Sequence, residues 1–273
     1  MTEIDVLFQG TPGAICCHRA GDVIVDPGPG STVRTLLDRL GGARPRAILL
    51  THIHLDHAGA TGVLIREWPD VEVWVHANGA RHLVDPSRLI ASATRIYGDR
   101  MGPLWGEIAP VPQERVVVLD GDEGERDGWR WAYTPGHASH HVTYFRDGVA
   151  YVGDVAGVRI GGGPTLPPTP PPDIDIEAWH ASIDLVERAG PRALAVTHFG
   201  THTDVAAHLA TLRENLDAWA QRARAEDPDA FEAHVRAHLH GVAEERAYLE
   251  AMPPETLYAG LARYWRNRNN VGG

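Results

Sequence analysis

Residues 51–57 read Thr51-His52-Ile53-His54-Leu55-Asp56-His57, and they follow directly on the short apolar run Ala-Ile-Leu-Leu at positions 47–50. A fully apolar run of this length predicts a strand that is buried on both faces. Side chains alternate along an extended strand end, so His52 and His54 are expected to project to the same side. A turn into a helix would then bring Asp56 and His57 beneath that pair. The stretch therefore predicts four polar side chains gathered at the end of one buried strand.

The residue types in this stretch favour a metal site. Imidazole nitrogen and carboxylate oxygen are the usual ligands of Zn²⁺, Mn²⁺ or Fe²⁺ in catalytic sites, whereas many structural zinc sites use thiolates. Gly59 and Gly62 follow, and they would permit close approach of the backbone. A lone histidine is more often an ordinary residue, and the chain contains 16 histidines. Four potential ligands within six residues argue against that interpretation here.

Three later apolar runs end in further candidate ligands. Residues 129–133 lead into Thr134-Pro135-Gly136-His137, residues 150–152 into Gly153-Asp154, and residues 193–196 into Thr197-His198. An earlier run at residues 22–25 leads into Asp26-Pro27-Gly28. Each run predicts a strand, and the loops that follow the strands are expected to reach a common rim, where functional groups usually lie.

In this order the motifs resemble those of the metallo-β-lactamase superfamily. The run from His52 to His57 is similar to the family's signature, and the motifs at His137, Asp154 and His198 are similar to its second, third and last motifs. Asp26-Pro27-Gly28 resembles the family's early Asp-x-Gly turn. The resemblance covers residues 4–200 and implies an α+β fold: a four-layer αββα sandwich of two mixed sheets covered by helices, with the site along one edge.

The resemblance also implies a ligand set for two divalent metal ions. One ion would be held by His52, His54 and His137, and the other by Asp56, His57 and His198. Asp154 would bridge both ions, a task that suits a carboxylate with two oxygens. Zn²⁺ is the expected metal, with Mn²⁺ or Fe²⁺ as alternatives. Two such ions, about 3.5 to 4 Å apart, share a hydroxide that acts as the nucleophile. Asp56 is the candidate for proton transfer after the attack; the alternative is that it serves as a ligand alone.

Two further residues are expected to support the ligands. Asp26 is predicted to accept a hydrogen bond from the outer nitrogen of a ligand histidine and so fix its tautomer; the alternative is a turn-forming Asp without a functional role. His141 lies four residues after His137, where relatives with a repeated Pro-Gly-His element have a second histidine. Here Ala138-Ser139-His140 replaces the beginning of that element, which argues against a glyoxalase-type assignment.

Residues 204–273 are expected to form a helical extension. Apolar residues fall at helical spacing behind Asp204, which is the expected N-cap, and further helices are expected at residues 231–249 and 256–265. We therefore expect a catalytic domain at residues 1–203 and helices at residues 204–273 that pack on the same domain as a lid, a cover or a homodimer contact.

Two segments are expected to shape the substrate pocket. Residues 85–112 contain Tyr97 and Trp105, which are the candidate pocket residues, and residues 161–172 form a loop dense in glycine and proline. Neither segment contains a basic cluster, which disfavours a phosphate-rich substrate. Shortening the loop at residues 161–172 is expected to change substrate preference without changing metal content.

Composition narrows the classes of function. The formal net charge of −11 disfavours nucleic acid as a partner. All 25 basic residues are arginine, which excludes a lysine Schiff base or a Walker-type lysine. Cys16 and Cys17 are adjacent and poorly placed to bridge each other. No stretch approaches the roughly 18 apolar residues that cross a bilayer, and the N-terminus does not resemble a signal peptide. A cytoplasmic location, no membrane partner and a small-molecule substrate are expected.

The resulting hypothesis is a binuclear metallo-hydrolase that acts on a carboxylic ester, lactone or thioester. There is no cysteine near Asp154, so the chain does not resemble the true β-lactamases in which a thiolate binds the second metal. One alternative is hydrolysis of small phosphodiesters or phosphotriesters. An alternative from another class is a mononuclear-iron oxidoreductase, similar to the persulfide dioxygenases, that uses only His52, His137 and Asp154.

Overall fold

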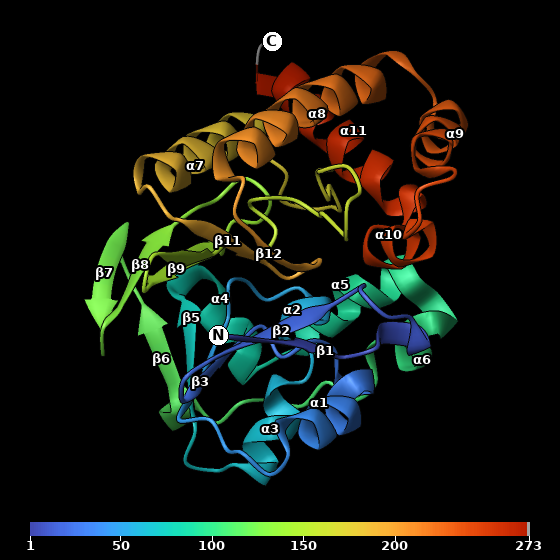
Figure 1. The fold of residues 1–273 in the computed structure, drawn as a ribbon. Helices are drawn as coiled ribbons and strands as arrows, with labels where there is room; N and C mark the ends of the chain where they lie inside the picture. The colour runs from blue at the N-terminus through green and yellow to red at the C-terminus, as the bar shows by residue number, and fades with distance from the viewer. Residues whose placement is uncertain (272–273) are drawn as a thin grey trace.

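The computed structural model describes residues 1–271, with side chains placed through residue 269. Within this range the strands form two six-stranded sheets (Figure 1). The first has the order β1-β2-β3-β4-β5-β6, and the second has the order β12-β11-β10-β9-β8-β7. Both sheets are mixed, because β3 to β6 are parallel beside the antiparallel β1 and β2, and β10 and β11 are parallel within the otherwise antiparallel second sheet.

The strands are short, and β3, β4, β8, β10 and β11 lie at or within one residue of the runs that the sequence predicted. The first sheet contains β1 (Thr2–Asp5), β2 (Cys16–Ala20), β3 (Val23–Val25), β4 (Ala47–Leu49), β5 (Glu72–His76) and β6 (Val116–Leu119). The second contains β7 (Glu123–Arg126), β8 (Trp129–Tyr133), β9 (Val142–Arg146), β10 (Val149–Tyr151), β11 (Ala193–Val196) and β12 (Gly200–His202).

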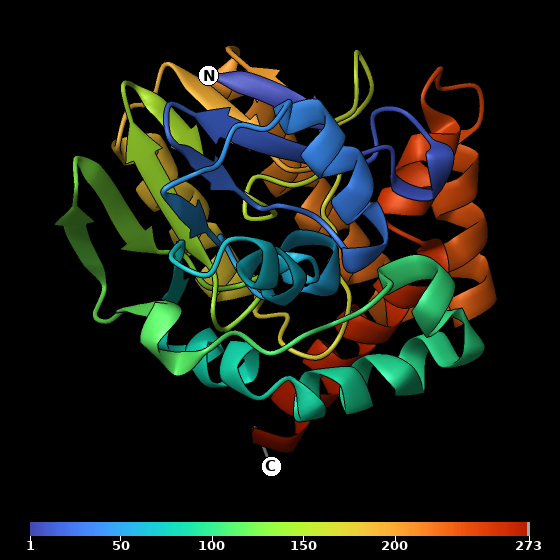
Figure 2. The ribbon, with the colours of Figure 1, turned by 90° about the horizontal axis from the view of Figure 1, so that it is seen from below.

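Helices cover the outer face of each sheet, which confirms the predicted four-layer sandwich (Figures 1 and 2). On the side of the first sheet lie α1 (Val33–Leu40), α2 (Leu55–Ala58), α3 (Thr61–Glu67), α4 (Ala77–Val84), α5 (Ser87–Tyr97) and α6 (Met101–Trp105). On the side of the second lie α7 (Ile176–Arg188), α8 (Val205–Ala225), α9 (Pro228–Leu239), α10 (Glu245–Ala251) and α11 (Pro254–Val271). Short 3₁₀ turns occupy Phe8–Gly10, Gly30–Thr32, Gly98–Arg100 and Gln113–Arg115.

The alternation of side chains along β4 explains why this strand is apolar throughout. Ala47 and Leu49 belong to a core cluster between the two sheets, together with Trp74 and Trp129. Ile48 and Leu50 belong to the second and larger cluster, which lies on the helical side. Because both faces of β4 are buried, the chain can place polar groups only after the strand has ended.

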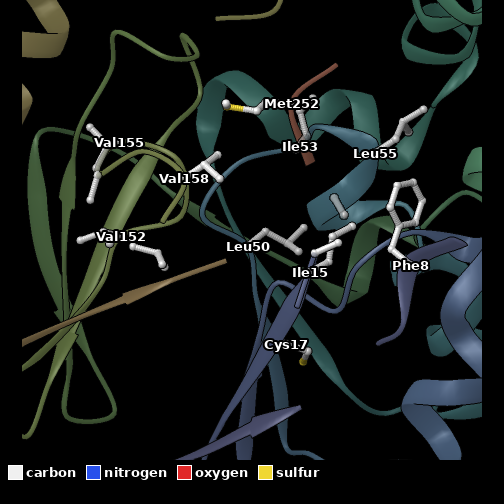
Figure 3. Packing of buried hydrophobic residues seen from close by; sticks show 14 of the residues in the cluster. Phe8, Ile15, Cys17, Leu50, Ile53, Leu55, Val152, Val155, Val158 and Met252 are labelled. Carbon is white, nitrogen blue, oxygen red and sulfur yellow. The ribbon is translucent and has the colours of Figure 1, made fainter. Parts of the chain in front are cut away.

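The larger core cluster joins parts of the chain that are distant in sequence. It includes Ile15, Leu50, Val152 and, from the segment after α10, Met252 (Figure 3). Helix α8 packs on α7, and α11 packs on α8 and α9. Trp265 of α11 donates its indole N–H to the Ala220 carbonyl, at 2.7 Å. Helices α8 to α11 thus share one apolar core with both sheets.

Several local predictions differ from the structure. The sequence pattern did not indicate β7, whose residues Glu-Gly-Glu-Arg are mostly exposed at a sheet edge, or the three-residue β12. The helix expected at residues 231–249 is interrupted, because Gly241 adopts φ +83° between α9 and α10. Asp204 precedes α8, but its side chain does not cap that helix. Both of its carboxylate oxygens lie 2.8 Å from Arg159 Nη1 instead.

None of the helices within residues 1–271 combines the length and the apolar character that crossing a bilayer requires.

Candidate metal centre

The predicted ligands lie in four loops at one edge of the two sheets. His52 follows β4, His137 follows β8, Asp154 follows β10 and His198 follows β11. Helix α2 begins at Leu55, so the chain turns as the sequence analysis expected and brings Asp56 and His57 back toward His52. A side chain at Gly62 would collide with the Ala109 backbone, which is the close approach predicted for that glycine.

His52, His54 and His137 form one set of converging nitrogens. His54 Nδ1 lies 3.0 Å from His52 Nε2 and 3.0 Å from His137 Nε2. Two nitrogens bonded at 2.0–2.1 Å to one tetrahedral ion lie about 3.4 Å apart. The three imidazoles therefore have the spacing of ligands around a single ion.

Asp56, His57 and His198 form the second set. Asp56 Oδ2 lies 3.8 Å from His57 Nε2 and 3.4 Å from His198 Nε2. The side chain of Asp56 is 20% exposed, whereas those of His57 and His198 are at most 1% exposed. Asp56 is therefore the member of this set that is most accessible to a substrate.

Asp154 stands between the two sets and offers one oxygen to each. Its Oδ2 lies 3.3 Å from His137 Nε2, and its Oδ1 lies 3.3 Å from His57 Nε2 and 3.6 Å from His198 Nε2. The structure thus brings all seven predicted ligands together, in the grouping that the resemblance implied. Their assignment as ligands stays a prediction.

The outer nitrogens of three histidines are held by acceptors on the surrounding protein. Nδ1 of His137 lies 2.9 Å from the Pro168 carbonyl, and Nδ1 of His198 lies 2.8 Å from the Ala14 carbonyl. Nδ1 of His57 lies 2.8 Å from Asp26 Oδ2. A carbonyl or carboxylate oxygen can only accept, so each of these Nδ1 atoms carries the proton. Each Nε2 is therefore the nitrogen left to face the centre, as in metal-binding histidines.

Asp26, in the loop after β3, connects two of the four loops from below the centre, those after β4 and β11. Its carboxylate accepts hydrogen bonds from the Thr51 N–H at 2.8 Å and the Thr51 hydroxyl at 2.7 Å, from the Thr197 hydroxyl at 2.8 Å and from His57. Thr51 and Thr197 come directly before the ligands His52 and His198. The Asp26 side chain is fully buried and its φ is +51°. It makes the contact to an outer histidine nitrogen that the sequence analysis expected.

The carboxylates of the buried cluster are ionised, and this negative charge favours the binding of cations. Burial alone would raise the pKa of Asp154, but His57, His198 and His137 lower it by more, and its pKa lies well below the usual value. Burial also raises the pKa of Asp56, but His57 and His198 lower it by more, so that this pKa falls to about 2. The pKa of Asp26 is lowered as well, because its contacts with His57 and Thr51 outweigh burial. Three ionised carboxylates thus lie within or beneath the cluster.

The histidines balance only part of this negative charge. Burial lowers the pKa of His52 well below its usual value, and neighbouring histidines lower it further. Burial also lowers the pKa of His137, to about 4. His57 and His198 differ: burial lowers the pKa of each, but Asp154 and Asp56 raise it by more, so that both net shifts are upward. Asp26 also raises the pKa of His57.

The ion pairs of these carboxylates within residues 1–269 are with histidine alone. Three buried polar atoms of the cluster have no hydrogen-bond partner among the described residues, namely His57 Nε2, His198 Nε2 and Asp154 Oδ1. Buried polar atoms without partners are rare. These donor types, spacings and unpaired atoms fit two divalent cations.

Two further histidines, His141 and His140, lie beside His52 and belong to neither set of predicted ligands. His141 makes no hydrogen bond to a predicted ligand; its Nδ1 lies 2.9 Å from the Thr134 hydroxyl, and its ring packs 5.2 Å from that of His52. His140, which the sequence analysis did not single out, stacks on His52 with ring centres 6.0 Å apart. Its Nδ1 accepts a hydrogen bond from the Ile53 N–H, at 3.4 Å.

A cavity of about 330 Å³ opens at the centre. His54, Asp56, Asp154 and His198 form part of its lining, and most of the remaining wall is apolar. Tyr97 and Trp105 are both part of the wall and pack edge-to-face at 5.0 Å. Residues of α10 and α11 and of the segment between them complete it, from Leu249 to Leu257. No pattern in the sequence had indicated that the segment from Leu249 to Leu257 lines the cavity.

The loop at residues 161–172 contributes to both the cavity and the metal centre. Pro168, Pro170, Pro171 and Pro172 line the cavity, and the Pro168 carbonyl holds the outer nitrogen of His137. Shortening this loop should therefore change metal content as well as substrate preference, which corrects the expectation drawn from the sequence.

Deletion of residues 167–169 is thus expected to lower metal affinity at the three-histidine set by about 10- to 100-fold, the usual effect of losing a partner of a ligand histidine. Metal titration of the metal-free protein measures this. Gly162→Ala, whose added Cβ would meet no atom within 4 Å, is the control. Unchanged affinity in the deletion variant would show that the Pro168 contact has no influence on His137.

Comparison with known proteins agrees with this geometry. The model of the metallo-beta-lactamase superfamily matches residues 7–199, and the chain belongs to this superfamily. It is a metallo-hydrolase of that class by its fold and its cluster of histidine and aspartate side chains.

Individual relatives are distant. The chain is 28% identical over 194 residues to the metallo-beta-lactamase fold-containing protein ST1585 of Sulfurisphaera tokodaii, which covers 68% of this chain and 71% of that protein. It is 31% identical over 214 residues to a hydroxyacylglutathione hydrolase of Xanthomonas campestris pv. campestris, covering 77% of this chain and 71% of that enzyme.

Solved structures show the same fold. The crystal structure of ST1585 superposes with a TM-score of 0.68 at 23% identity and covers 95% of this chain and 97% of that one. The structure of TTHA1623 in a di-iron-bound form has a TM-score of 0.58 at 23% identity and covers 78% of this chain and 98% of that one.

Proposed function

We propose that the chain hydrolyses carboxylic esters, thioesters or lactones that have an apolar acyl group, with two divalent metal ions, most simply Zn²⁺, at the cluster. The observation that carries this proposal is the position of the cluster in the wall of a largely apolar cavity of about 330 Å³. An acyl chain in that cavity places its carbonyl carbon beside the side chains that form the cluster.

The ligand roles follow from the two sets of donors. His52, His54 and His137 would hold one ion, Asp56, His57 and His198 the other, and Asp154 would bridge them. Such ions lower the pKa of bound water and polarise a carbonyl oxygen. A nucleophilic serine, cysteine or lysine is then not required.

The protein side chains have three further tasks in this proposal. The apolar wall excludes water and binds the acyl chain, at about 0.8 kcal/mol for each buried methylene. Asp26 and the carbonyls of Ala14 and Pro168 keep the histidine lone pairs directed inward. Asp56, the most exposed carboxylate of the cluster, is placed to accept a proton from the attacking water and pass it to the leaving oxygen or sulfur.

The comparisons support an acyl compound as the general class of substrate. Several of the relatives are hydroxyacylglutathione hydrolases, and an acylglutathione is a thioester. The helices that follow the catalytic region at residues 1–203 fit the proposal as a wall of the acyl cavity, because the segment from Leu249 to Leu257 lines that cavity.

A substrate panel with metal analysis tests this function. Esters, thioesters and lactones with acetyl to octanoyl groups are assayed beside small phosphodiesters, and the metals are counted in the purified chain. Hydrolysis of acyl compounds with two ions per chain is expected. Preference for phosphodiesters would favour the other hydrolase hypothesis, and one iron with oxygen uptake would favour the oxidoreductase. A di-iron neighbour makes the metal count necessary.

A single substitution tests whether the apolar cavity holds the acyl chain. Ala93 on α5 lines the cavity and is 8% exposed. Ala93→Leu is expected to exclude about two methylenes from the wall, worth about 1.6 kcal/mol, and to lower kcat/KM for octanoyl esters roughly tenfold while acetyl esters change little. Ala91→Leu on the same helix, which is exposed, is the control. An equal loss for both chain lengths would place the acyl group elsewhere.

A further inference from the structure

A second cavity, of about 500 Å³, adjoins the metal centre on the side of α4 and α5. Four residues line both cavities, namely His54, Leu89, Ser92 and Pro172. His54, a candidate ligand, therefore lies at the boundary between them. A substrate whose reacting carbonyl lies at the cluster has space on both sides of the bond that breaks.

The second cavity differs from the first in the chemistry of its wall. Polar side chains dominate it, and two arginines reach it from separate helices: Arg81 from α4 and Arg88 from α5. Asp173 is the one acidic residue of this wall. In a chain with a net charge of −11, a wall with two arginines and one aspartate is a local excess of positive charge.

Both guanidinium groups lack a carboxylate partner among residues 1–269. Arg81 Nε donates a hydrogen bond to His82 Nε2, at 3.1 Å, and Arg88 makes neither a hydrogen bond nor an ion pair within that range. Asp173 is engaged elsewhere, because its Oδ2 accepts hydrogen bonds from the Ser139 hydroxyl at 2.5 Å and the Ser139 N–H at 3.3 Å. The two arginines therefore remain free to pair with an incoming anion.

The lowered pKa of His82, which also lines this cavity, agrees with an excess of positive charge around it. Burial is the largest cause of its lowered pKa, and the charges of Arg81 and Arg88 lower it further, while Asp85 and Asp173 oppose them. The charges of the two arginines thus have a larger effect on this imidazole than those of the two aspartates. The same charges would attract a bound oxyanion.

From these observations we propose that the second cavity binds the leaving half of the substrate, and that this half carries an oxyanion, a carboxylate or a phosphate, that pairs with Arg81 and Arg88. Guanidinium groups match both oxyanions with paired N–H donors. This inference rests on the proposed function and adds the leaving group to it. In the reaction a bond forms between the water oxygen and the acyl carbon, the acyl C–O or C–S bond breaks, and the departing alcohol or thiol takes the proton.

Matched thioesters test the proposal. Octanoyl thioesters of 3-mercaptopropionate, 2-mercaptoethyl phosphate and neutral propanethiol share one acyl group and differ in the charge of the thiol. Arg81→Gln and Arg88→Gln are each expected to raise KM for an anionic thioester by about tenfold or more, in line with 1.5–3 kcal/mol for a hydrogen bond to a charged group. Turnover and the neutral thioester should change less than twofold, and Arg95→Gln, an exposed arginine of α5 outside the wall, should behave as wild type.

The two anionic thioesters separate a carboxylate site from a phosphate site, because the arginine variants should affect the preferred one more. Equal effects on charged and neutral thioesters, or no effect, would overturn the proposal.

A binding measurement keeps this inference separate from the reaction itself. Calorimetric titration of the zinc-loaded chain with 3-(methylthio)propanoate, and with its uncharged methyl ester, requires no turnover. The acid should bind more tightly than the ester, and the Arg81/Arg88 double variant should lose that difference. Equal binding of the acid by the double variant contradicts the arginine site even when thioesters are hydrolysed. Binding of the acid that depends on the arginines, without hydrolysis of any acyl compound, would instead contradict the proposed function and still support the arginine site.

Discussion

Replacement of Asp154 by alanine or asparagine is expected to remove metal and activity together. Its two oxygens face different ligand sets, with Oδ2 at 3.3 Å from His137 Nε2 and Oδ1 at 3.3 Å from His57 Nε2. Neither variant retains an anionic oxygen for each ion. We expect fewer than two tightly bound ions per chain and a fall in kcat/KM of at least about 10³-fold, since the activated water and the polarised carbonyl are both lost.

The Asp154 measurement combines metal counting with steady-state kinetics on one preparation. Asp217→Asn is the control, because Asp217 is an exposed carboxylate that pairs with His180 at 2.8 Å and lies outside the cluster. Thermal unfolding of the metal-free proteins shows whether the Asp154 variants still fold. Turnover at the wild-type rate in a folded Asp154→Ala variant would refute the bridging role.

Removal of Asp26 is the second change with a large expected effect. Asp26→Ala leaves the Thr51 N–H, the hydroxyls of Thr51 and Thr197, and the His57 ring without their acceptor in a fully buried position. Deleting one partner of a buried charged network costs about 3–5 kcal/mol. The alanine also has to adopt φ +51°, a conformation that aspartate tolerates better. A decrease in Tm of about 10 °C is expected for a chain of this size.

The same substitution should weaken metal binding, because His57 loses the partner that fixes its tautomer. A 10- to 100-fold loss of affinity is typical for such a change. Metal titration and thermal unfolding are measured beside Asp85→Ala, in which the lost aspartate accepts a bond from the Ser87 N–H in an exposed turn. If Asp26→Ala costs no more than Asp85→Ala in both measurements, Asp26 forms a turn and nothing more.

The fold and the candidate ligands could be inferred from the sequence because both depend on local patterns. The runs that became β4, β10 and β11 are short and apolar, β8 is apolar except for the exposed Arg130, and each polar motif begins where the run ends. A strand buried on both faces excludes polar side chains, so its end marks the place where chemistry can begin. The grouping of seven ligands into two sets came from the resemblance, since spacing along the chain does not determine which loops meet.

Other parts of the site could not be inferred because they depend on tertiary contacts. The acceptors for His137 and His198 are the backbone carbonyls of Pro168 and Ala14, and a carbonyl has no sequence signature. Arg81 and Arg88 lie on different helices and become neighbours only when α4 and α5 pack. The cavity wall from Leu249 to Leu257 comes from helices outside the superfamily match at residues 7–199.

Edge strands were missed for a related reason. β7 contains charged, exposed residues and is held mainly by pairing with β8. Its own side chains show no apolar alternation, so the partner strand rather than the local sequence determines its conformation. The break between α9 and α10 at Gly241, in contrast, had a recognisable stop signal in the glycine itself.

Anomalous X-ray diffraction from crystals of the metal-loaded chain would locate the bound ions. Two anomalous peaks are expected, one among His52, His54 and His137 and the other among Asp56, His57 and His198, with the Asp154 carboxylate between them. A metal-loaded structure in which these imidazoles face no common ion, or in which the anomalous signal lies away from Asp154, would contradict this ligand assignment.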